Sequence, residues 1–362
     1  MKTITSQLYE WSQYQPDRQM DFNGHFVLPS ANEPGVLIDP VPFQSGDEAQ
    51  VRSLGGVAAV LLTNGDHVRD AARCAEAFGC PVYVSLADLE RAGLATAEAF
   101  EPGAMLPGGL RAIPVPDNKS PGETAFYHIA SGTMIVGDAV IGAPAGQLSL
   151  LAADKYADVP RAARGLRALL SRRLTRLLLG DGCSILHEPA PAIQELIYRL
   201  DPAAFVVRQE ELFWPPPFTH GNRFGGQHAE YSQLVGLKVI DFAMTRLMPG
   251  RQNFPLHRHD GEEELFVVLS GRGEVRTEQH AFPIQAGDVL AFPPRFQLAH
   301  AIRNTGDEDL RFLSFAAPAE TLEMVDYPDA GTRLEATKYG KRRRFTLPDR
   351  LDVPYFEGEQ VD

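Results

Sequence analysis

The sequence predicts a chain of two domains, a mixed α/β domain followed by an all-β barrel of short antiparallel strands. Three observations support this prediction. The first half alternates short apolar runs with segments of helical spacing. Three consecutive prolines, Pro215 to Pro217, then interrupt the chain. Beyond them, short strand-like runs separated by Gly and Pro follow closely, with hardly any helical pattern.

The first half contains five short apolar runs bounded by turn residues, which we expect to be strands. In chain order they are residues 26–28, 35–40, 57–62, 81–84 and 134–138. Two segments have helical spacing instead, residues 69–78 and the Arg/Leu/Ala segment 161–179. Strands and helices together indicate an α/β domain.

The boundary between the domains is expected at the proline run. Prolines lack the N–H donor that a helix or a sheet interior needs, so this stretch is typical of a linker. We assign residues 1–205 to the first domain, 206–220 to a proline-rich linker and 221–362 to the second domain. Segments 327–329 and 352–359 are expected to form an extension that wraps the barrel.

Composition excludes several classes of protein. No window of eighteen apolar residues could span a bilayer, and the N-terminus has no apolar signal region, so we expect a cytoplasmic protein with no membrane partner. A net charge of −13 disfavours nucleic-acid binding. The basic run 341–344 is expected to be a solvated strand end. Cys74, Cys80 and Cys183 lack C-x-x-C spacing, so we expect small buried side chains rather than disulfides or a zinc site.

The second half contains a group of residues suited to binding a metal. His257 and His259 are separated by one residue, and positions i and i+2 of a strand point to the same face, so both imidazoles can meet one ion. Glu264 begins the next apolar run, and His300 follows a Gly-Asp strand and two prolines.

These residues resemble the two motifs of the cupin superfamily, over about 120 residues. The motifs are H-x-H with a following Glu and Gly, then a Gly-Asp strand, a proline and H-x-x-x-N. The resemblance implies a double-stranded β-helix, or jelly-roll barrel, that holds a metal through His257, His259, Glu264 and His300. Imidazoles with one carboxylate suit Fe, Mn, Ni, Cu or Zn, among which the sequence does not choose.

The match to the cupin motifs leaves one choice of carboxylate and contains one departure from the usual pattern. Glu263 is a competing carboxylate, but only Glu264 has the six-residue gap to Gly271. Arg295 stands where many cupins have Gly, and the stretch before His300 is slightly longer than usual. We therefore expect an altered loop beside an unchanged ligand.

The first half more loosely resembles the metallo-β-lactamase fold of glyoxalase II-type hydrolases, over about 180 residues. The resemblance implies an αββα sandwich. Its landmarks are residues 37–40, 61–70, 120–127, 136–138 and 179–182. The family's histidine ligands are replaced here, and only Asp138 matches its ligand outright. The positions concerned hold Asn64, Asp66, Arg69, Glu123 and Asp181. The dinuclear zinc site should therefore be absent, since imidazole donors are lost and Arg69 brings a positive charge.

Two alternatives remain for this first domain. It can serve as a scaffold or a dimerisation unit without chemistry of its own. Alternatively, Asp66, Glu123, Asp138 and Asp181, with His67 beside them, converge as an oxygen-rich site for Mg²⁺ or Ca²⁺. Carboxylates clustered without an ion would instead raise one another's pKa or pair with Arg69.

Three functions are compatible with the sequence. The first is a metal-dependent oxidoreductase of the dioxygenase type, acting on a small organic acid or aromatic that chelates the metal. The second is a protein that binds or senses a small ligand through a structural metal, and the third is a metal-dependent isomerase or lyase. By resemblance to cupins we also expect a homodimer. The fold does not decide among these chemistries.

Overall fold

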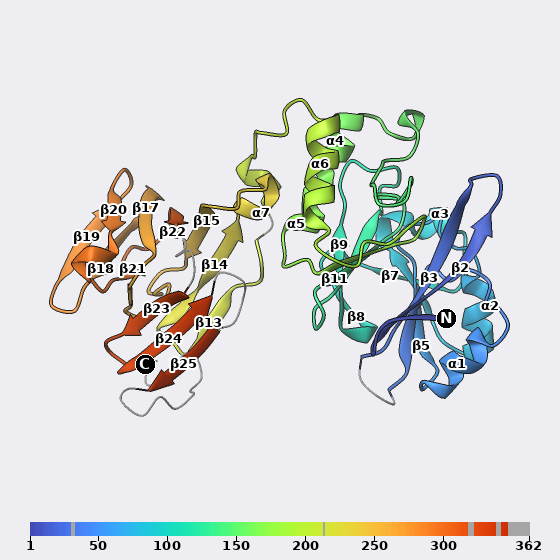
Figure 1. The fold of residues 1–362 in the computed structure, drawn as a ribbon, viewed down its shortest axis with the longest axis horizontal. Helices are drawn as coiled ribbons and strands as arrows, with labels where there is room; N and C mark the ends of the chain where they lie inside the picture. Colours follow the sequence, from blue (N-terminus) through green and yellow to red (C-terminus); the bar gives the residue numbers. More distant parts are fainter. Residues whose placement is uncertain (30–32, 213, 318–321, 338–341, 347–362) are drawn as a thin grey trace. The chain divides into compact units, whose positions relative to one another are not determined.

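The computed structural model describes residues 1–29, 33–212, 214–317, 322–337 and 342–346 (Figure 1). It consists of two compact units, Met1–Val206 and Val207–Asp362.

The first unit begins with a seven-stranded sheet whose strands follow one another in chain order. The first four strands pair antiparallel and the last four pair parallel, with the fourth belonging to both groups. Parallel neighbours need a crossover, and helices provide it here. The strands are β1 (Lys2–Thr5), β2 (Leu8–Gln15), β3 (Met20–Val27), β4 (Gly35–Ile38), β5 (Val57–Leu61), β6 (Val82–Ser85) and β7 (Ala97–Phe100), and the helices are α1 (Asp47–Ser53), α2 (Ala71–Phe78), η1 (Leu86–Asp88) and α3 (Leu89–Ala92).

A second sheet of five strands completes the β structure of this unit, in the order β12-β11-β10-β9-β8. Its strands are β8 (Met105–Leu106), β9 (Leu110–Pro114), β10 (Thr124–His128), β11 (Thr133–Val136) and β12 (Arg176–Leu179). The connecting helices are η2 (Pro107–Gly109), η3 (Ala153–Lys155), α4 (Val159–Gly165) and α5 (Arg167–Leu170), and α6 (Ala190–Leu200) follows the last strand.

Apolar side chains of both sheets share one core. Leu8, Ile38 and Leu61 of the first sheet pack with Phe126 and Ile135 of the second, and all five are fully buried. On its other face the first sheet packs against α1 and α2. Sheet-on-sheet packing therefore brings the ends of strands from both sheets together.

Two expectations for this unit are wrong. Residues 161–179 do not form one helix, because the chain leaves α5 at Leu170 and residues 176–179 form β12. This strand pairs parallel with β11, and burial of Leu177, Leu178 and Leu179 outweighs their helical preference. Of the three cysteines only Cys74 is buried, whereas Cys183 is exposed.

The second unit is built from antiparallel strands. A six-stranded sheet has the order β13-β14-β15-β22-β17-β20, and a three-stranded sheet has the order β19-β18-β21. The six strands are β13 (Phe218–His220), β14 (Phe224–Glu230), β15 (Asp241–Leu247), β22 (Leu310–Ala317), β17 (Glu263–Ser270) and β20 (Val289–Phe292). The three are β19 (Ala281–Gln285), β18 (Arg272–Arg276) and β21 (Ala301–Asn304), and the short helices are η4 (Gln209–Glu211), α7 (Ser232–Val235) and η5 (Pro294–Phe296).

The core of this unit lies between those two sheets. Leu247, Phe266 and Phe312 of the larger sheet pack with Val275 and Ile302 of the smaller one. Such an interior is expected for a small barrel, whose inward positions are filled by side chains.

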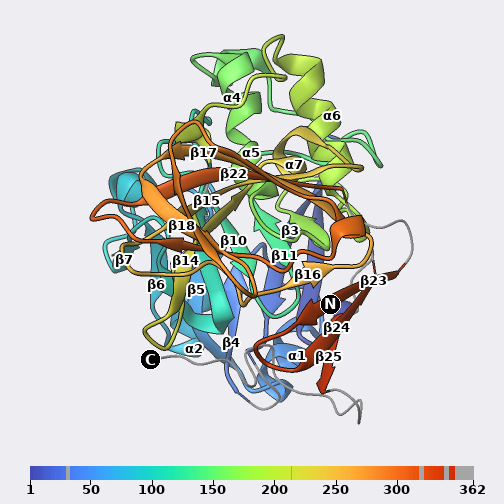
Figure 2. The ribbon, with the colours of Figure 1, turned by 90° about the vertical axis from the view of Figure 1, so that its left-hand side faces the viewer.

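A further four-stranded sheet has the order β16-β23-β24-β25. Its strands are β16 (Arg258–His259), β23 (Leu322–Tyr327), β24 (Thr332–Thr337) and β25 (Arg342–Thr346). Both views show β23, β24 and β25 side by side (Figures 1 and 2). The three C-terminal strands are thus joined to the barrel through β16.

The boundaries of the linker need correction. Residues 218–220, assigned to the linker, form β13, because this segment pairs with β14 and Phe218 stacks on Phe254. Residues 352–359 and Lys341 lie outside the described part of the chain.

None of the helices among the described residues is both long enough and apolar enough to cross a bilayer.

Candidate metal centre

Backbone pairing places the three histidines of the second unit. His257 and His300 face each other in an antiparallel bridge, in which their N–H groups and carbonyls exchange hydrogen bonds of 3.2 and 2.8 Å. His259 ends the short strand β16. Glu264 lies near the start of β17.

The four residues converge. Ligand atoms of His257, His259 and Glu264 all lie within 4.8 Å of one another. Glu264 Oε2 lies 3.9 Å from Nε2 of His257, 3.4 Å from that of His259 and 3.0 Å from that of His300. The carboxylate therefore lies close to the Nε2 atoms of all three imidazoles.

Contacts of the second ring nitrogen orient two of the imidazoles. Nδ1 of His257 donates to the carbonyl of Pro255 at 2.8 Å, and Nδ1 of His300 points at the carbonyl of Leu298 at 3.4 Å. Because a carbonyl only accepts, Nδ1 carries the proton and Nε2 keeps its lone pair. That lone pair is the one a metal ion needs.

The surroundings of His257 and Glu264 keep these two donors in the protonation states that suit a metal. Burial, together with the neighbouring His300, lowers the pKa of His257 to about 3. Burial opposes ionisation of Glu264, but His300 and the other two imidazoles outweigh it and lower the pKa of Glu264 to about 2. At neutral pH His257 is thus neutral and Glu264 is a carboxylate, which are the forms that bind a metal. Phe292 stacks on His300 with ring centroids 3.6 Å apart and fixes that ring.

The donor set fits a divalent transition metal. Glu264 Oε2 and His300 Nε2 are buried and lie 3.0 Å apart, but this contact does not have the geometry of a hydrogen bond, and neither atom has another hydrogen-bond partner among the described residues. Buried polar atoms are almost always satisfied, so these two atoms are suited to a bound cation. Three imidazoles and one carboxylate suit Fe, Mn, Ni, Cu or Zn.

The structure adds a residue that the sequence did not indicate. Glu323 of β23 is buried, and its Oε1 lies 3.3 Å from Nδ1 of His259. The same oxygen accepts the N–H groups of Asp260 at 3.0 Å and Gly261 at 3.3 Å. Burial opposes protonation of His259, but Glu323 and the neighbouring carboxylates raise its pKa. No local motif marks Glu323, since it approaches the site only through the pairing of β23 with β16.

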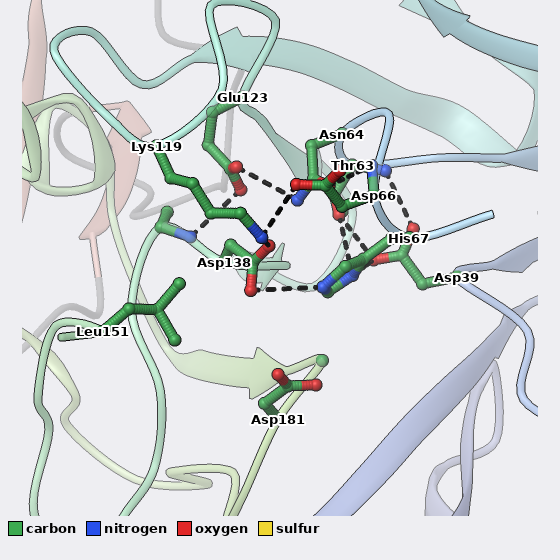
Figure 3. A network of polar contacts seen from close by, with 12 residues as sticks. Asp39, Thr63, Asn64, Asp66, His67, Lys119, Glu123, Asp138, Leu151 and Asp181 are labelled. Carbon is green, nitrogen blue, oxygen red and sulfur yellow. Dashed lines mark hydrogen bonds and ion pairs between the residues drawn. The ribbon is translucent and has the colours of Figure 1, made fainter. Parts of the chain in front are cut away.

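In the first unit, part of the proposed oxygen-rich cluster comes together. Among the described residues, ligand atoms of His67, Asp138 and Asp181 lie within 4.8 Å of one another. Figure 3 shows His67 between Asp39 and Asp138, with the Nδ1 atom 2.7 Å from Asp39 Oδ2 and the Nε2 atom 3.4 Å from Asp138 Oδ1. Burial and the nearby Arg69 oppose protonation of His67, but the two carboxylates outweigh them and raise its pKa to about 10.

The other two members of that cluster are bound elsewhere. Asp66 forms ion pairs with Arg91 and Lys119, both at distances below 3 Å. Glu123 accepts a hydrogen bond from Asn64 at 3.0 Å, and burial with the nearby Asp138 raises its pKa well above the usual range. The structure thus groups His67, Asp138 and Asp181, whereas Asp66 and Glu123 contact other side chains.

Comparison with protein families assigns both halves of the chain. Residues 1–200 match the model of the metallo-beta-lactamase superfamily. The chain belongs to that superfamily. Residues 243–316 match the model of the cupin domain, so the chain joins a metallo-beta-lactamase domain to a cupin domain.

Individual relatives match parts of the chain. An oxalate-binding protein from Thermotoga maritima is 34% identical over 114 residues, which are 30% of this chain and 90% of that protein. Auxin-binding protein 1 from Arabidopsis thaliana is 37% identical over 91 residues, which are 23% of this chain and only 44% of that protein. A solved structure from Acidithiobacillus ferrooxidans, described as a sugar phosphate isomerase, is 26% identical, covers 42% of this chain and 99% of its own, and has a TM-score of 0.37.

The metallo-beta-lactamase domain of this chain does not fit the dinuclear zinc site that the resemblance to glyoxalase II-type hydrolases would imply. A guanidinium nitrogen of Arg69 contacts Asp181 and lies 3.3 Å from Nε2 of His67, so it fills the space between two of the would-be ligands. The ammonium of Lys119 lies 2.6 Å from Asp138. Side-chain cations thus neutralise the carboxylates that would otherwise attract a metal.

Proposed function

We propose that the cupin domain holds one divalent transition metal ion through His257, His259, Glu264 and His300, and that a small organic acid binds at this ion. The observation that supports the metal is the pair of buried, unsatisfied atoms, Glu264 Oε2 and His300 Nε2. A bound divalent ion would satisfy both and would polarise a ligand oxygen at a free coordination position.

The ligand class is inferred from a relative. The Thermotoga maritima protein that is 34% identical to this chain, and that the chain covers to 90%, is named an oxalate-binding protein. Oxalate is a small dicarboxylate that can offer two oxygens to one metal ion. We therefore propose a small chelating organic acid, with oxalate as the first compound to test.

Metal analysis of the purified protein tests the metal centre. We expect about one equivalent after reconstitution of the wild type, and none in the His257→Ala/His259→Ala double variant. His280→Ala is a matched control, since His280 is an exposed histidine of the same domain. A wild type without metal after reconstitution, or a double variant that keeps the metal, would contradict the proposal.

Calorimetric titration with oxalate tests the ligand. The metal-loaded protein should bind oxalate and the metal-free protein should not, because the acid is proposed to bind through the ion. Equal binding by both forms would place the acid elsewhere. If another organic acid bound more tightly than oxalate, the proposed metal centre would stand and the proposed ligand would be replaced.

We propose a dioxygenase-type oxidation as the reaction at this ion. Isomerase or lyase chemistry and binding without reaction are the alternatives. A dioxygenase-type oxidation would consume O₂ with the organic acid when the protein is loaded with Fe(II). An isomerase or lyase would convert the acid without O₂ consumption, and a binding or sensing protein would leave it unchanged. Oxygen uptake combined with product analysis separates the three, and the name of the oxalate-binding relative favours binding as the alternative to oxidation.

For the metallo-beta-lactamase domain we propose a scaffolding role. Arg69 and Lys119 bind the carboxylates of its residual cluster, which leaves no donor set for two zinc ions. We expect no thioester hydrolysis with added zinc. The homodimer and the cytoplasmic location stay predictions. Sedimentation analysis measures the oligomeric state and so tests the homodimer.

A further inference from the structure

We propose that Glu323 of β23 positions His259 for metal binding, which makes the C-terminal strand β23 a part of the metal centre. This inference depends on the proposed function, because it concerns the same ion. Glu323 is a positioning residue here: it acts through His259 and through the turn that follows it.

Several donors surround one carboxylate oxygen of Glu323. Oε1 of Glu323 lies 3.3 Å from Nδ1 of His259 and accepts the N–H groups of Asp260 at 3.0 Å and Gly261 at 3.3 Å. Asp260 and Gly261 form the turn between the ligands His259 and Glu264. One buried oxygen therefore contacts a ligand ring and the loop that leads to the next ligand.

The tautomer of His259 depends on the group that faces its Nδ1 atom. His257 and His300 direct Nδ1 toward backbone carbonyls, whereas among the contacts described for His259 that place is taken by Glu323. With the proton on Nδ1 facing the carboxylate, Nε2 keeps its lone pair, and this atom lies 3.4 Å from Glu264 Oε2. A carboxylate behind a metal-binding imidazole fixes the ring and increases its basicity.

The position of Glu323 also argues against a direct ligand role. Its Oε1 lies 3.3 Å from Nδ1 of His259, whereas the Nε2 atom of the same ring lies 3.4 Å from the ligand Glu264. It contacts the opposite nitrogen of the His259 ring. Glu323 therefore orients the His259 ring and places a negative charge beside it.

Side chains on both faces of β23 contact β16 or the residue just before it. Alternate residues of a strand point to opposite sides. On one side Glu323 meets His259, and the ring of Tyr327 lies 6.1 Å from that of His257 at an interplanar angle of 26°. On the other side Asp326 binds Arg258, the residue between the two histidines, at 3.2 Å. The pairing of Arg258 with Asp326 and of His259 with Val325 completes the attachment.

Metal affinity of a charge variant tests the inference. Glu323→Gln keeps an oxygen acceptor of the same shape and removes the negative charge. We expect Zn²⁺, titrated alone in competition with a chelator, to bind the variant about 10–100-fold more weakly than the wild type. Glu335→Gln is the matched control, because Glu335 lies opposite Met324 on β24, one residue along from Glu323. Its affinity should stay within about twofold of the wild type, well below the change expected for an outer-shell carboxylate.

The outcomes separate this inference from the proposed function. Equal Zn²⁺ affinity of Glu323→Gln and the wild type would overturn the positioning role and leave the metal centre intact. A wild type that binds no Zn²⁺ would overturn the proposed function and this inference with it. An equal loss in both glutamate variants would indicate a general charge effect and would also count against Glu323.

A second measurement does not depend on the folding of a variant. Hydrogen exchange of the wild type, with and without Zn²⁺, reports whether the ion stabilises the attachment of β23. We expect slower exchange of the amides of residues 258–264 and 322–327 on metal binding. If only residues 258–264 respond, β23 is not part of the centre and the inference fails.

Discussion

Glu263 and Glu264 are neighbours in the chain, yet they have different surroundings. Glu264 lies against three imidazoles, whereas Glu263 is exposed, because successive residues of β17 point to opposite faces. We predict that Glu264→Gln weakens metal binding by more than the roughly 10–100-fold that outer-shell changes cost. Glu263→Gln should bind metal like the wild type, and metal titration of both variants checks this. If the two variants lost affinity equally, Glu264 would not be the ligand.

His67 gives the metallo-beta-lactamase domain a dependence on pH. Asp39 and Asp138 raise the pKa of His67 to about 10, and His67 in turn helps to keep the pKa values of both carboxyls low despite burial. Because the folded pKa of the imidazole lies above its unfolded value of about 6.5, its protonation stabilises the fold fully below pH 6.5. This contribution is lost as the pH rises to about 10, and that of the carboxylates is lost in acid, below about pH 4.

The free energy of unfolding should therefore fall between about pH 6.5 and 10, with a slope of up to about 1.4 kcal/mol per pH unit for one proton. Urea unfolding at several pH values measures this slope for the wild type and for His67→Gln. The variant should be less stable at pH 6 and should show a flatter dependence over this range. An identical slope in both proteins would assign the effect to another group.

Arg69 connects strands that are distant in the sequence. Its guanidinium donates to the carbonyl of Asn23 in β3 at 2.9 Å and to that of Gly180 after β12 at 3.3 Å, and it binds Asp181. It also lies over the ring of Phe22, 4.8 Å from the ring centre. The side chain thus links β3 of the first sheet to the residues that follow β12 of the second sheet.

We predict that Arg69→Met lowers the free energy of unfolding by about 3–5 kcal/mol, because it leaves the buried carboxylate of Asp181 without its partner. Arg91→Met is the matched control. Its ion pair with Asp66 is far more exposed, so it should cost at most about 1 kcal/mol. Chemical denaturation measures the free energy of unfolding of both variants. Equal losses would show that Arg69 contributes no more to stability than an exposed ion pair does.

The two units have separate hydrophobic cores, one between the sheets of the metallo-beta-lactamase domain and one inside the cupin barrel. Separate cores make separate unfolding transitions the expected behaviour. A metal bound only by the cupin domain should raise the temperature of one transition and leave the other unchanged. At a free metal concentration of 100 times Kd the stabilisation is about 2.7 kcal/mol.

Differential scanning calorimetry with and without metal checks this prediction. The His257→Ala/His259→Ala variant should show the same two transitions, both insensitive to metal. If metal shifted both transitions of the wild type, either the units would unfold together or the first unit would bind metal as well.

Much of the fold was predictable from local patterns. The apolar runs 35–40 and 57–62 contain β4 and β5, and the run 81–84 overlaps β6, because short buried strands are marked by their own residues. The helix expected at 69–78 corresponds to α2. The helix expected at 161–179 was wrong, because the residues that make 176–179 a strand lie about forty residues earlier, in β11.

The sequence by itself determined the two families and the residues that meet in the cupin barrel. Side chains alternate between the two faces of a strand. The H-x-H motif and the Glu at the start of the next strand therefore predict which side chains point toward the site. The tertiary structure alone decided the surroundings of these residues. Glu323 reaches His259 because β23 pairs with β16, and Arg69 reaches Asp181 because two sheets pack together. Such contacts join residues more than sixty positions apart, and no local periodicity encodes them.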